Sequence, residues 1–209
     1  MEQRDGQEAV SHATAKPRRN ASATRQAILD SASQAFTRAG YDGVGVREIA
    51  QNAGVTAMLV NRYFGSKEKL FEEAVEATLA VPGILRNEIT KAQNDMQRLS
   101  QALAAELVAT TSPGVSPLDG ILLLIRSAAN EQAATILRES AVRHLKPLVD
   151  ILSGEDAPDR AAMFLAVVAG FLLMRRVIAV PALVEAEQPA LIKHLQGILE
   201  CLLCEKEQG

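Results

Sequence analysis

The sequence predicts an all-α protein in which three short N-terminal helices are followed by a larger helical body. Ala and Leu, which favour helices, dominate the 209 residues. Apolar residues recur at the spacing of one helix face, and no segment alternates with period two for long enough to form a strand. Apolar residues make up 48% of the chain, which is enough to build a core.

Charge is distributed unevenly along the chain. The formal net charge is −3, but residues 16–69 carry nine Lys or Arg against four Asp or Glu. Residues 70–209 carry 12 basic and 18 acidic groups. A basic segment on an acidic body predicts a polyanionic partner for the first part only.

The first helix is predicted to follow a flexible tail. Residues 1–21 are polar and show no apolar pattern, and Thr24 is positioned as the N-cap of the helix. The basic group Lys16–Arg19 fits either an arm that reaches DNA or a plain solubilising tail. The helix ends at Gly40, and its apolar face consists of Ile28, Ala32, Ala35, Phe36 and Ala39.

Two short helices joined by a tight turn come next, and they form a predicted helix-turn-helix over about residues 45–64. The first ends at Gly54, which suits a left-handed cap. Its inward face consists of Val46, Ile49, Ala50 and Ala53. The second starts after its cap, Thr56, and its inward residues are Leu59, Val60 and Phe64.

The rest of the chain is predicted to be helical throughout. A fourth helix starts at its cap, Ser66, and runs to about Ala80, before Pro82 interrupts it. The later helices are predicted at 84–110, 117–130, 131–152 with a kink or break at Pro147, 158–179 and 189–205.

The second helix of a helix-turn-helix normally enters the major groove with its N-terminal residues at the base edges. In this sequence those residues are Thr56, Ala57 and Met58, with Asn61 one turn later. Asn pairs with adenine, whereas Thr, Ala and Met contact thymine methyl groups. The residues predicted to complete the DNA contact are Arg25, Arg47, Arg62, Tyr63 and Lys67. The alternative is a helical hairpin with a solvated polar end.

The stretch AFTRAGYDGVGVREIAQNAGVTAMLVNRYFGSKEKLFEEAV closely resembles the DNA-binding domain of the tetracycline-repressor (TetR) family. The resemblance extends over about Thr24–Leu79. It includes the aromatic-Gly-Tyr run and the pairs Ile49-Ala50, Gly54-Val55 and Tyr63-Phe64, followed by Ser66-Lys67-Glu68. The remainder of the chain matches this family only in length and helical character.

The resemblance implies a dimeric transcriptional regulator, in most cases a repressor, whose C-terminal domain binds a small ligand that displaces the fourth helix. By position, Lys67 matches the family's phosphate-binding lysine, and Tyr63 matches an aromatic or His that contacts the backbone. Asn61, Met58 and Gly45 depart from the Tyr, small residue and Thr or Ser that are usual at these positions. These departures bear on the operator sequence and not on the binding mode.

We therefore expect a flexible tail (1–21), a helix-turn-helix DNA-binding domain (22–82) and a regulatory and dimerisation domain (83–209). Pro82-Gly83 is a candidate hinge between the last two. The apolar body predicts an apolar or amphipathic effector. The predicted pocket residues are Met96, Leu99, Leu103, Ile121, Leu124, Phe164, Phe171 and Met174. The same side chains could instead fill a solid core.

The most apolar stretch, Ala161–Met174, has 14 residues. A membrane span needs about 20, so we expect a buried helix in a protein that does not enter a membrane. The helices at 158–179 and 189–205 are predicted to form a four-helix bundle with a second copy. The polar N-terminus does not resemble a signal peptide. We expect a cytoplasmic homodimer that binds a double-stranded DNA operator.

Other chemistry is predicted to be absent. Cys201 and Cys204 are too few for a disulfide framework, and the histidines lie far apart in the sequence, so we expect no metal and no cofactor. Ser66–Lys69 has the S-x-x-K pattern of some acyl-transfer enzymes without the partner motifs, so we expect no catalytic residue. Arg175 and Arg176 fit a solvated helix end, a pair with an acid, or contact with an anionic ligand.

Two alternatives to a ligand-released repressor stay open. The protein could be an activator or a regulator that needs no ligand, which the sequence does not distinguish. It could instead be a helical enzyme or carrier. An enzyme needs titratable groups that converge in a pocket, and the predicted body offers few.

Overall fold

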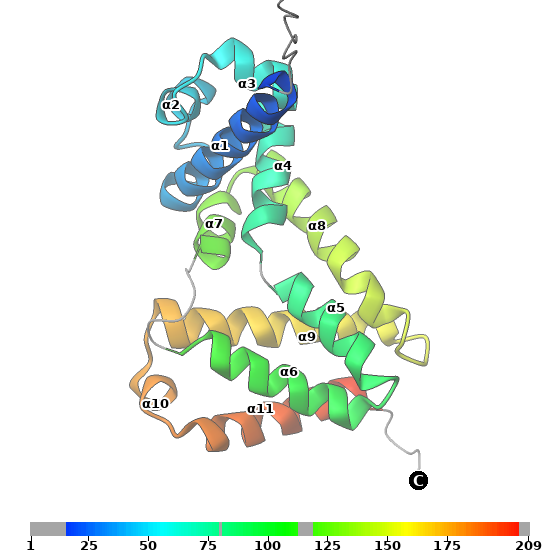
Figure 1. Cartoon of the computed structure of the whole chain (residues 1–209). Helices are drawn as coiled ribbons and strands as arrows, with labels where there is room; N and C mark the ends of the chain where they lie inside the picture. Colours follow the sequence, from blue (N-terminus) through cyan, green and yellow to red (C-terminus); the bar gives the residue numbers. More distant parts are fainter. Residues whose placement is uncertain (1–15, 80, 113–118, 205–209) are drawn as a thin grey trace, which may run out of the picture.

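The computed structural model describes residues 16–79, 81–112 and 119–204, and these residues contain helices and no strand. They form two lobes, one above the other in the view of Figure 1. The predicted all-α architecture, with a small N-terminal part and a larger C-terminal one, is confirmed.

The upper lobe contains the four N-terminal helices and one helix from later in the chain. These are α1 (Lys16–Ala39), α2 (Val46–Asn52), α3 (Ala57–Phe64), α4 (Lys67–Thr78) and α7 (Asp119–Ser127). Phe36, Tyr41 and Phe71 lie at the centre of its core, with ring centroids 5.0 to 6.1 Å apart. The α7 residue Leu123 is fully buried in the same core. A helix of the C-terminal half therefore supports the N-terminal domain.

The lower lobe is built on a second core around Leu99, Phe164 and Leu199. Its elements are α5 (Val81–Ala92), α6 (Met96–Thr110), α9 (Ala157–Leu172), the π-helical turn η1 (Leu173–Val177), α10 (Pro181–Val184) and α11 (Gln188–Leu203). Helix α8 (Glu131–Val149) runs from the upper lobe down to the lower one (Figure 1). This helix therefore contacts both lobes.

The first helix starts earlier than predicted. It begins at Lys16, so Thr24 lies inside α1 and is not its N-cap. Pro17 is no obstacle, because in the first turn of a helix the missing N–H has no partner to lose. Residues 1–15 of the predicted tail lie outside the described residues.

The predicted helix at 84–110 is two helices. Gln93 and Asn94 adopt positive φ angles of 52° and 68°, which end α5. Asp95 then caps α6, since its carboxylate accepts the Arg98 N–H at 2.9 Å. Apolar periodicity alone does not reveal such a break, because the apolar face resumes after the turn.

Three further boundaries differ from the prediction. Helix α4 ends at Thr78, and Pro82 lies in the first turn of α5 instead of stopping α4. Pro147 does not break α8, which continues to Val149. The predicted loop before the last helix contains the short α10.

The apolar helix α9 is only partly buried, which corrects our expectation of a buried helix. Phe164 and Val168 are buried, but Met163 is 55% exposed. Together α9 and η1 form a helical stretch, Ala157–Val177, that is long and apolar enough to cross a membrane by length and composition alone. Core helices of soluble proteins pass the same test. The exposed side of this stretch is one that a partner could cover.

Candidate nucleic-acid interface and ligand cavity

The turn between α2 and α3 is fixed by its own backbone. Gly54 has a φ of +69°, as the predicted left-handed cap requires. The Gly54 N–H donates to Gln51 O at 3.1 Å and the Val55 N–H donates to Ala50 O at 2.9 Å. These two bonds form a Schellman motif, which sets the angle at which α3 leaves α2.

Helix α3 exposes residues that the sequence predicts to contact base edges. Thr56 caps it, because the Leu59 N–H donates to the threonine hydroxyl at 3.3 Å. Val60 and Phe64 are buried, and helical spacing therefore turns Asn61 outward. The other exposed residues of α3 are Arg62 and Met58, the latter 80% exposed. An apolar side chain so exposed on a short helix has no role in the described core.

The start of α4 lies beside the end of α3. Ser66 is its N-cap, as predicted, and accepts the Lys69 N–H at 3.3 Å. The Lys67 ammonium lies 4.3 Å from the centroid of the Tyr41 ring. This cation–π contact holds the amine at the helix N-terminus, where backbone N–H groups also favour an anion.

Tyr41 is itself held by α4. Its hydroxyl donates to Glu68 Oε1 at 3.1 Å. Burial, the hydrogen bond to Glu68 and the nearby carboxylate charges together raise the pKa of Tyr41 to about 12. The hydrogen bonds that the Glu68 carboxylate accepts, above all from Ser66, lower the pKa of that acid.

Arg25 differs from the other predicted DNA-binding residues. Its guanidinium binds both carboxylate oxygens of Glu73 at 2.7 and 2.5 Å and lies 4.6 Å from the Phe64 ring centroid. Arg25 therefore fastens α1 to α4. Arg47, by contrast, is exposed on α2, and Gly45 provides no side-chain cap to that helix, as its residue type implied.

Helix α7 supports the upper lobe through hydrogen bonds as well as packing. The Tyr41 N–H donates to Ser127 Oγ at 3.1 Å, and Arg126 Nη1 donates to Thr37 O at 2.5 Å. Gly40, with φ +71°, is so close to α7 that an added Cβ would lie 2.3 Å from Arg126 O. Sequence patterns did not predict this contact, because the partners are distant along the chain.

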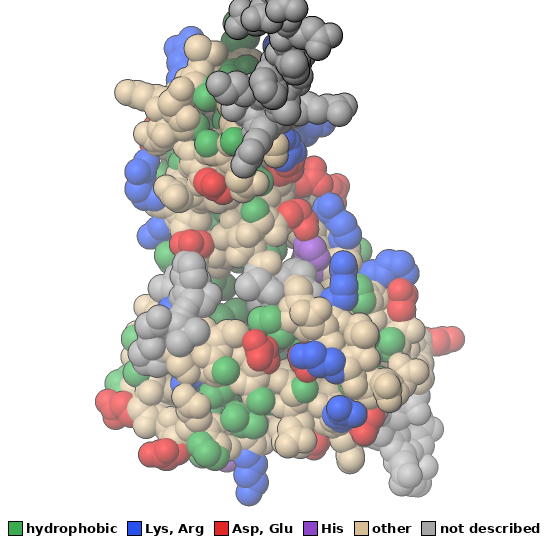
Figure 2. All heavy atoms as spheres, viewed as in Figure 1, with side chains coloured by type: hydrophobic (Ala, Val, Ile, Leu, Met, Phe, Trp, Pro, Cys, Tyr) green, Lys and Arg blue, Asp and Glu red, His purple; other side chains and the backbone are tan. Residues whose placement is uncertain are grey.

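A cavity of about 200 Å³ lies where the two lobes meet. Figure 2 shows hydrophobic side chains at this junction. Four of the predicted pocket residues line it: Leu103, Ile121, Leu124 and Phe164. The end of α4 also contributes, through Thr78 and Leu79. The wall of the cavity thus includes the helix whose other end carries Lys67.

The other four predicted pocket residues do not line this cavity. The cavity spans the C-terminal part of α6, so Leu99 belongs to the solid core and Met96 packs at its edge. On α9 and η1 the cavity faces the row that contains Leu165 and Leu172. Phe171 is partly buried against the core of the lower lobe, and Met174 is 42% exposed.

Sequence reasoning missed His144, which lines the cavity. Arg176 also lines it, and contact with an anionic ligand was one of the three roles that the sequence left open for that residue. His144 is 2.7 Å from Glu76 of α4, at ion-pairing distance. Arg176 donates from Nη1 to Ser112 O at 2.9 Å. The expectation of a solvated helix end is also wrong for Arg175, which is only 4% exposed. The π-helical turn places both arginines against the end of α6.

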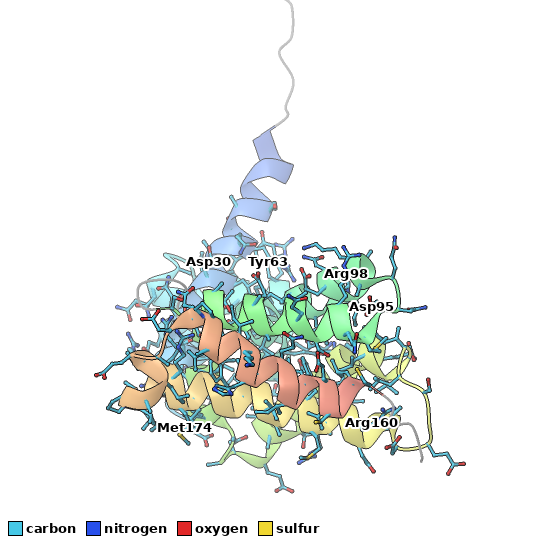
Figure 3. All side chains as sticks on the ribbon, turned by 90° about the horizontal axis from the view of Figure 1, so that it is seen from below. Asp30, Tyr63, Asp95, Arg98, Arg160 and Met174 are labelled. Carbon is cyan, nitrogen blue, oxygen red and sulfur yellow. The ribbon has the colours of Figure 1, made fainter. Side chains whose placement is uncertain are left out.

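The last helices of the chain carry exposed apolar side chains. Met163, Met174, Ile178 and Ile198 are between 42% and 59% exposed. Met163 lies on α9, Met174 on η1, Ile178 directly after η1 and Ile198 on α11, and α9 and α11 lie side by side when seen from below (Figure 3). Exposed apolar side chains on neighbouring helices are candidates for an interaction site.

Cys201 and Cys204 are free thiols on and after α11. Burial and nearby negative charges raise the pKa of Cys204. In the part of the chain that the structure describes, no group of three or more His, Cys, Asp or Glu side chains could hold a metal ion.

Two family profiles match the chain. Residues 28–74 match the one described as bacterial regulatory proteins of the tetR family. Residues 97–203 match the one described as the tetracyclin repressor-like C-terminal domain. No curated protein matches the chain.

Solved structures share the fold. A putative transcriptional regulator from Pseudomonas aeruginosa PAO1 has a TM-score of 0.65 and 21% identity, over 90% of this chain and 91% of that one. NalD, the secondary repressor of the MexAB-OprM multidrug efflux pump of Pseudomonas aeruginosa, has a TM-score of 0.63 and 18% identity, over 91% and 100%. A TetR-family regulator from Streptomyces coelicolor has a TM-score of 0.56 and 22% identity, over 94% and 100%.

Proposed function

Because this chain belongs to the TetR family of bacterial regulatory proteins, we propose that it is a homodimeric repressor that a small apolar or amphipathic molecule releases from its operator. One observation carries the DNA-binding part of this proposal. Helix α3 presents Met58 and Asn61 to solvent while the same short helix buries Val60 and Phe64. A helix anchored in this way projects its outward side chains into the major groove.

The contacts divide by type. Thr56, Ala57, Met58 and Asn61 are proposed to meet base edges. Arg47, Arg62, Tyr63 and Lys67 are proposed to meet phosphates, which position the protein without reading sequence. We leave Arg25 out of this surface because its guanidinium is occupied by Glu73.

The release mechanism rests on the shared wall of the cavity. Thr78 and Leu79 line the cavity at the end of α4, and Lys67 lies at the start of the same helix. A ligand that fits best when this end is displaced would tilt α4 and move α3. A tenfold loss of operator affinity requires about 1.4 kcal/mol of coupling. Pro82-Gly83, in the first turn of α5, stays the proposed hinge beyond the end of α4.

The homodimer rests on the exposed apolar face of α9, η1 and α11. Two helices from each copy would form a four-helix bundle and cover Met163 and Ile198. The two α3 helices of such a dimer would read half-sites about 34–36 Å apart, one turn of DNA. Because an operator is part of the chromosome, the proposed function places the protein in the cytoplasm.

The test is a selected-site DNA-binding screen with the full chain, followed by transcription in vitro from a promoter that carries the selected site. A repressor lowers transcription, and a ligand found by thermal shift restores it. Increased transcription would make the protein an activator. If the screen enriched no sequence, the proposed DNA-reading function would be wrong.

A further inference from the structure

The cavity between the lobes offers a ligand mainly aliphatic surface with few polar groups. Among the described residues, the polar side chains on its wall are Thr78, Thr110, His144 and Arg176. Both threonine hydroxyls donate to backbone carbonyls of their own helices, at 2.5 and 2.7 Å. His144 and Arg176 therefore determine the polarity of the wall.

The charge of the wall is positive. Among the described residues that line the cavity, Arg176 is the one permanently charged side chain, and none is Asp or Glu. A guanidinium keeps its proton at all physiological pH values. Its bond to Ser112 O holds the group in place beside the apolar surface, where a low dielectric constant strengthens its field.

A second cation lies next to the first. Arg175 is buried and donates to Val108 O, Thr111 Oγ1 and Leu183 O at 2.9, 2.7 and 3.1 Å. Burial first, and then the charge of Arg176, lower the pKa of Arg175. Because these three acceptors are neutral, Arg175 adds its charge to the potential at this end of the cavity.

We infer that the cavity selects a small amphiphile with a carboxylate or similar anionic head, which lies at Arg176 while its alkyl tail lies along Leu103 and Phe164. This inference rests on the proposed function, since it names the chemistry of the ligand at the same site. A carboxylate and a guanidinium form paired, charge-assisted hydrogen bonds, whereas a cationic head would be repelled.

The size of the cavity agrees with a short alkyl chain. An apolar cavity of about 150 Å³ holds benzene. This cavity, at about 200 Å³, suits a tail of modest length, and octanoate is therefore a suitable probe.

The experiment compares three probes that share one tail: octanoate, 1-octanol and octylammonium. Each is titrated into the full-length wild-type protein by calorimetry at constant ionic strength. We expect octanoate to bind at least about tenfold more tightly than octanol, as one well-placed ionic pair allows. Octylammonium should bind most weakly. Equal affinities for octanoate and octanol, or tighter binding of octylammonium, would overturn the inference without any variant.

Arg176→Gln should lower octanoate affinity to the level of octanol and leave octanol affinity unchanged. Arg176→Lys should keep part of the preference, because it keeps the charge but not the planar fork. Arg98→Gln is the matched control, since Arg98 is exposed on α6 and does not line the cavity. It removes the same charge and should not alter the preference. If Arg176→Gln does not fold, the wild-type probe series decides alone.

Operator binding with and without each probe separates this inference from the proposed function. Preferential binding of octanoate with unchanged operator affinity would support the anionic site and reject the switch. Specific operator binding with no binding of any probe would reject the anionic site and leave the DNA-reading function intact.

Discussion

His144 Nε2 on α8 lies 2.7 Å from Glu76 Oε2 on α4. His144 lines the cavity, whereas Glu76 does not. Ser140 Oγ, also on α8, donates to the other oxygen of the Glu76 carboxylate at 2.9 Å. The contact therefore connects a side chain that a ligand would touch to α4, the helix that begins at Lys67.

Glu76→Gln should weaken the coupling between the cavity and DNA. It leaves the cavity wall unchanged but removes the charge that faces His144. We expect ligand affinity to stay within about twofold, while ligand-induced loss of operator affinity falls from about tenfold to less than about threefold. Ligand titration and operator binding measure the two effects separately. Glu72→Gln is the control. Glu72 contacts Arg143, which is also on α8 but does not line the cavity. Equal effects of both changes would assign the coupling to general packing of α4 on α8.

Lys67→Ala and Asn61→Ala should affect DNA binding in different ways. Loss of the Lys67 ammonium should weaken binding to all sequences. It should also reduce the salt slope, which is the slope of log affinity against log salt concentration, by about one. Asn61→Ala should relax preference at one base pair, at a cost of about 1–3 kcal/mol. Binding to the selected site and to single-substitution variants over a salt series gives both quantities. If Lys67→Ala changed the preference and Asn61→Ala changed only the slope, our docking of α3 would be wrong.

Stability should fall at high pH through Tyr41. The pKa of Tyr41 rises to about 12 in the folded protein from an ordinary value of 10. The unfolded chain therefore loses this proton first, and the contribution is fully present below pH 10 and is lost between about pH 10 and 12. Between pH 9 and pH 11 we expect the free energy of unfolding to fall by about 1 kcal/mol more in the wild type than in Tyr41→Phe. Urea unfolding at the two values measures this. Glu68→Gln should keep much of the effect, since burial is the largest cause.

Gly40→Ala should destabilise the protein more than Gly54→Ala does. Both glycines have left-handed backbones, with φ of +71° and +69°. A methyl group at Gly54 meets open space, so the cost there is the conformational one of about 1–2 kcal/mol. At Gly40 the methyl group would also lie 2.3 Å from Arg126 O, and α7 would have to move. Urea unfolding of the two variants gives the comparison. Equal losses of unfolding free energy in the two variants would show that α7 moves away from the methyl group without an energetic cost.

Ile198→Asp should dissociate the proposed dimer. Ile198 is 47% exposed on α11, and a buried, unpaired carboxylate is costly. Light scattering at micromolar concentration should give a dimer mass for the wild type and a monomer mass for the variant, with weaker operator binding. Val142→Asp is the control, because Val142 is 68% exposed on α8, a helix that is not part of the proposed dimer interface. A monomeric wild type would refute the dimer.

The sequence by itself determined the helix-turn-helix and its caps. Gly54, Thr56 and Ser66 act on backbone groups within three or four residues, and such local hydrogen bonds depend on residue type and spacing alone. The inward and outward faces of α3 follow from the helical period for the same reason. Tyr63 and Lys67 could be assigned by position because the local pattern matches the family.

Only the tertiary structure decided which side chains surround the cavity and how they connect to DNA. Leu99 and Leu103 have the same apolar pattern on α6, yet one is solid core and the other lines the cavity. Their difference depends on how the neighbouring helices, above all α11 and α5, pack against α6, which no local spacing encodes. The same holds for Arg175, which a π-helical turn directs at the end of α6, and for the contact between His144 and Glu76. Such contacts join residues far apart in the chain, and only the packing of whole helices brings them together.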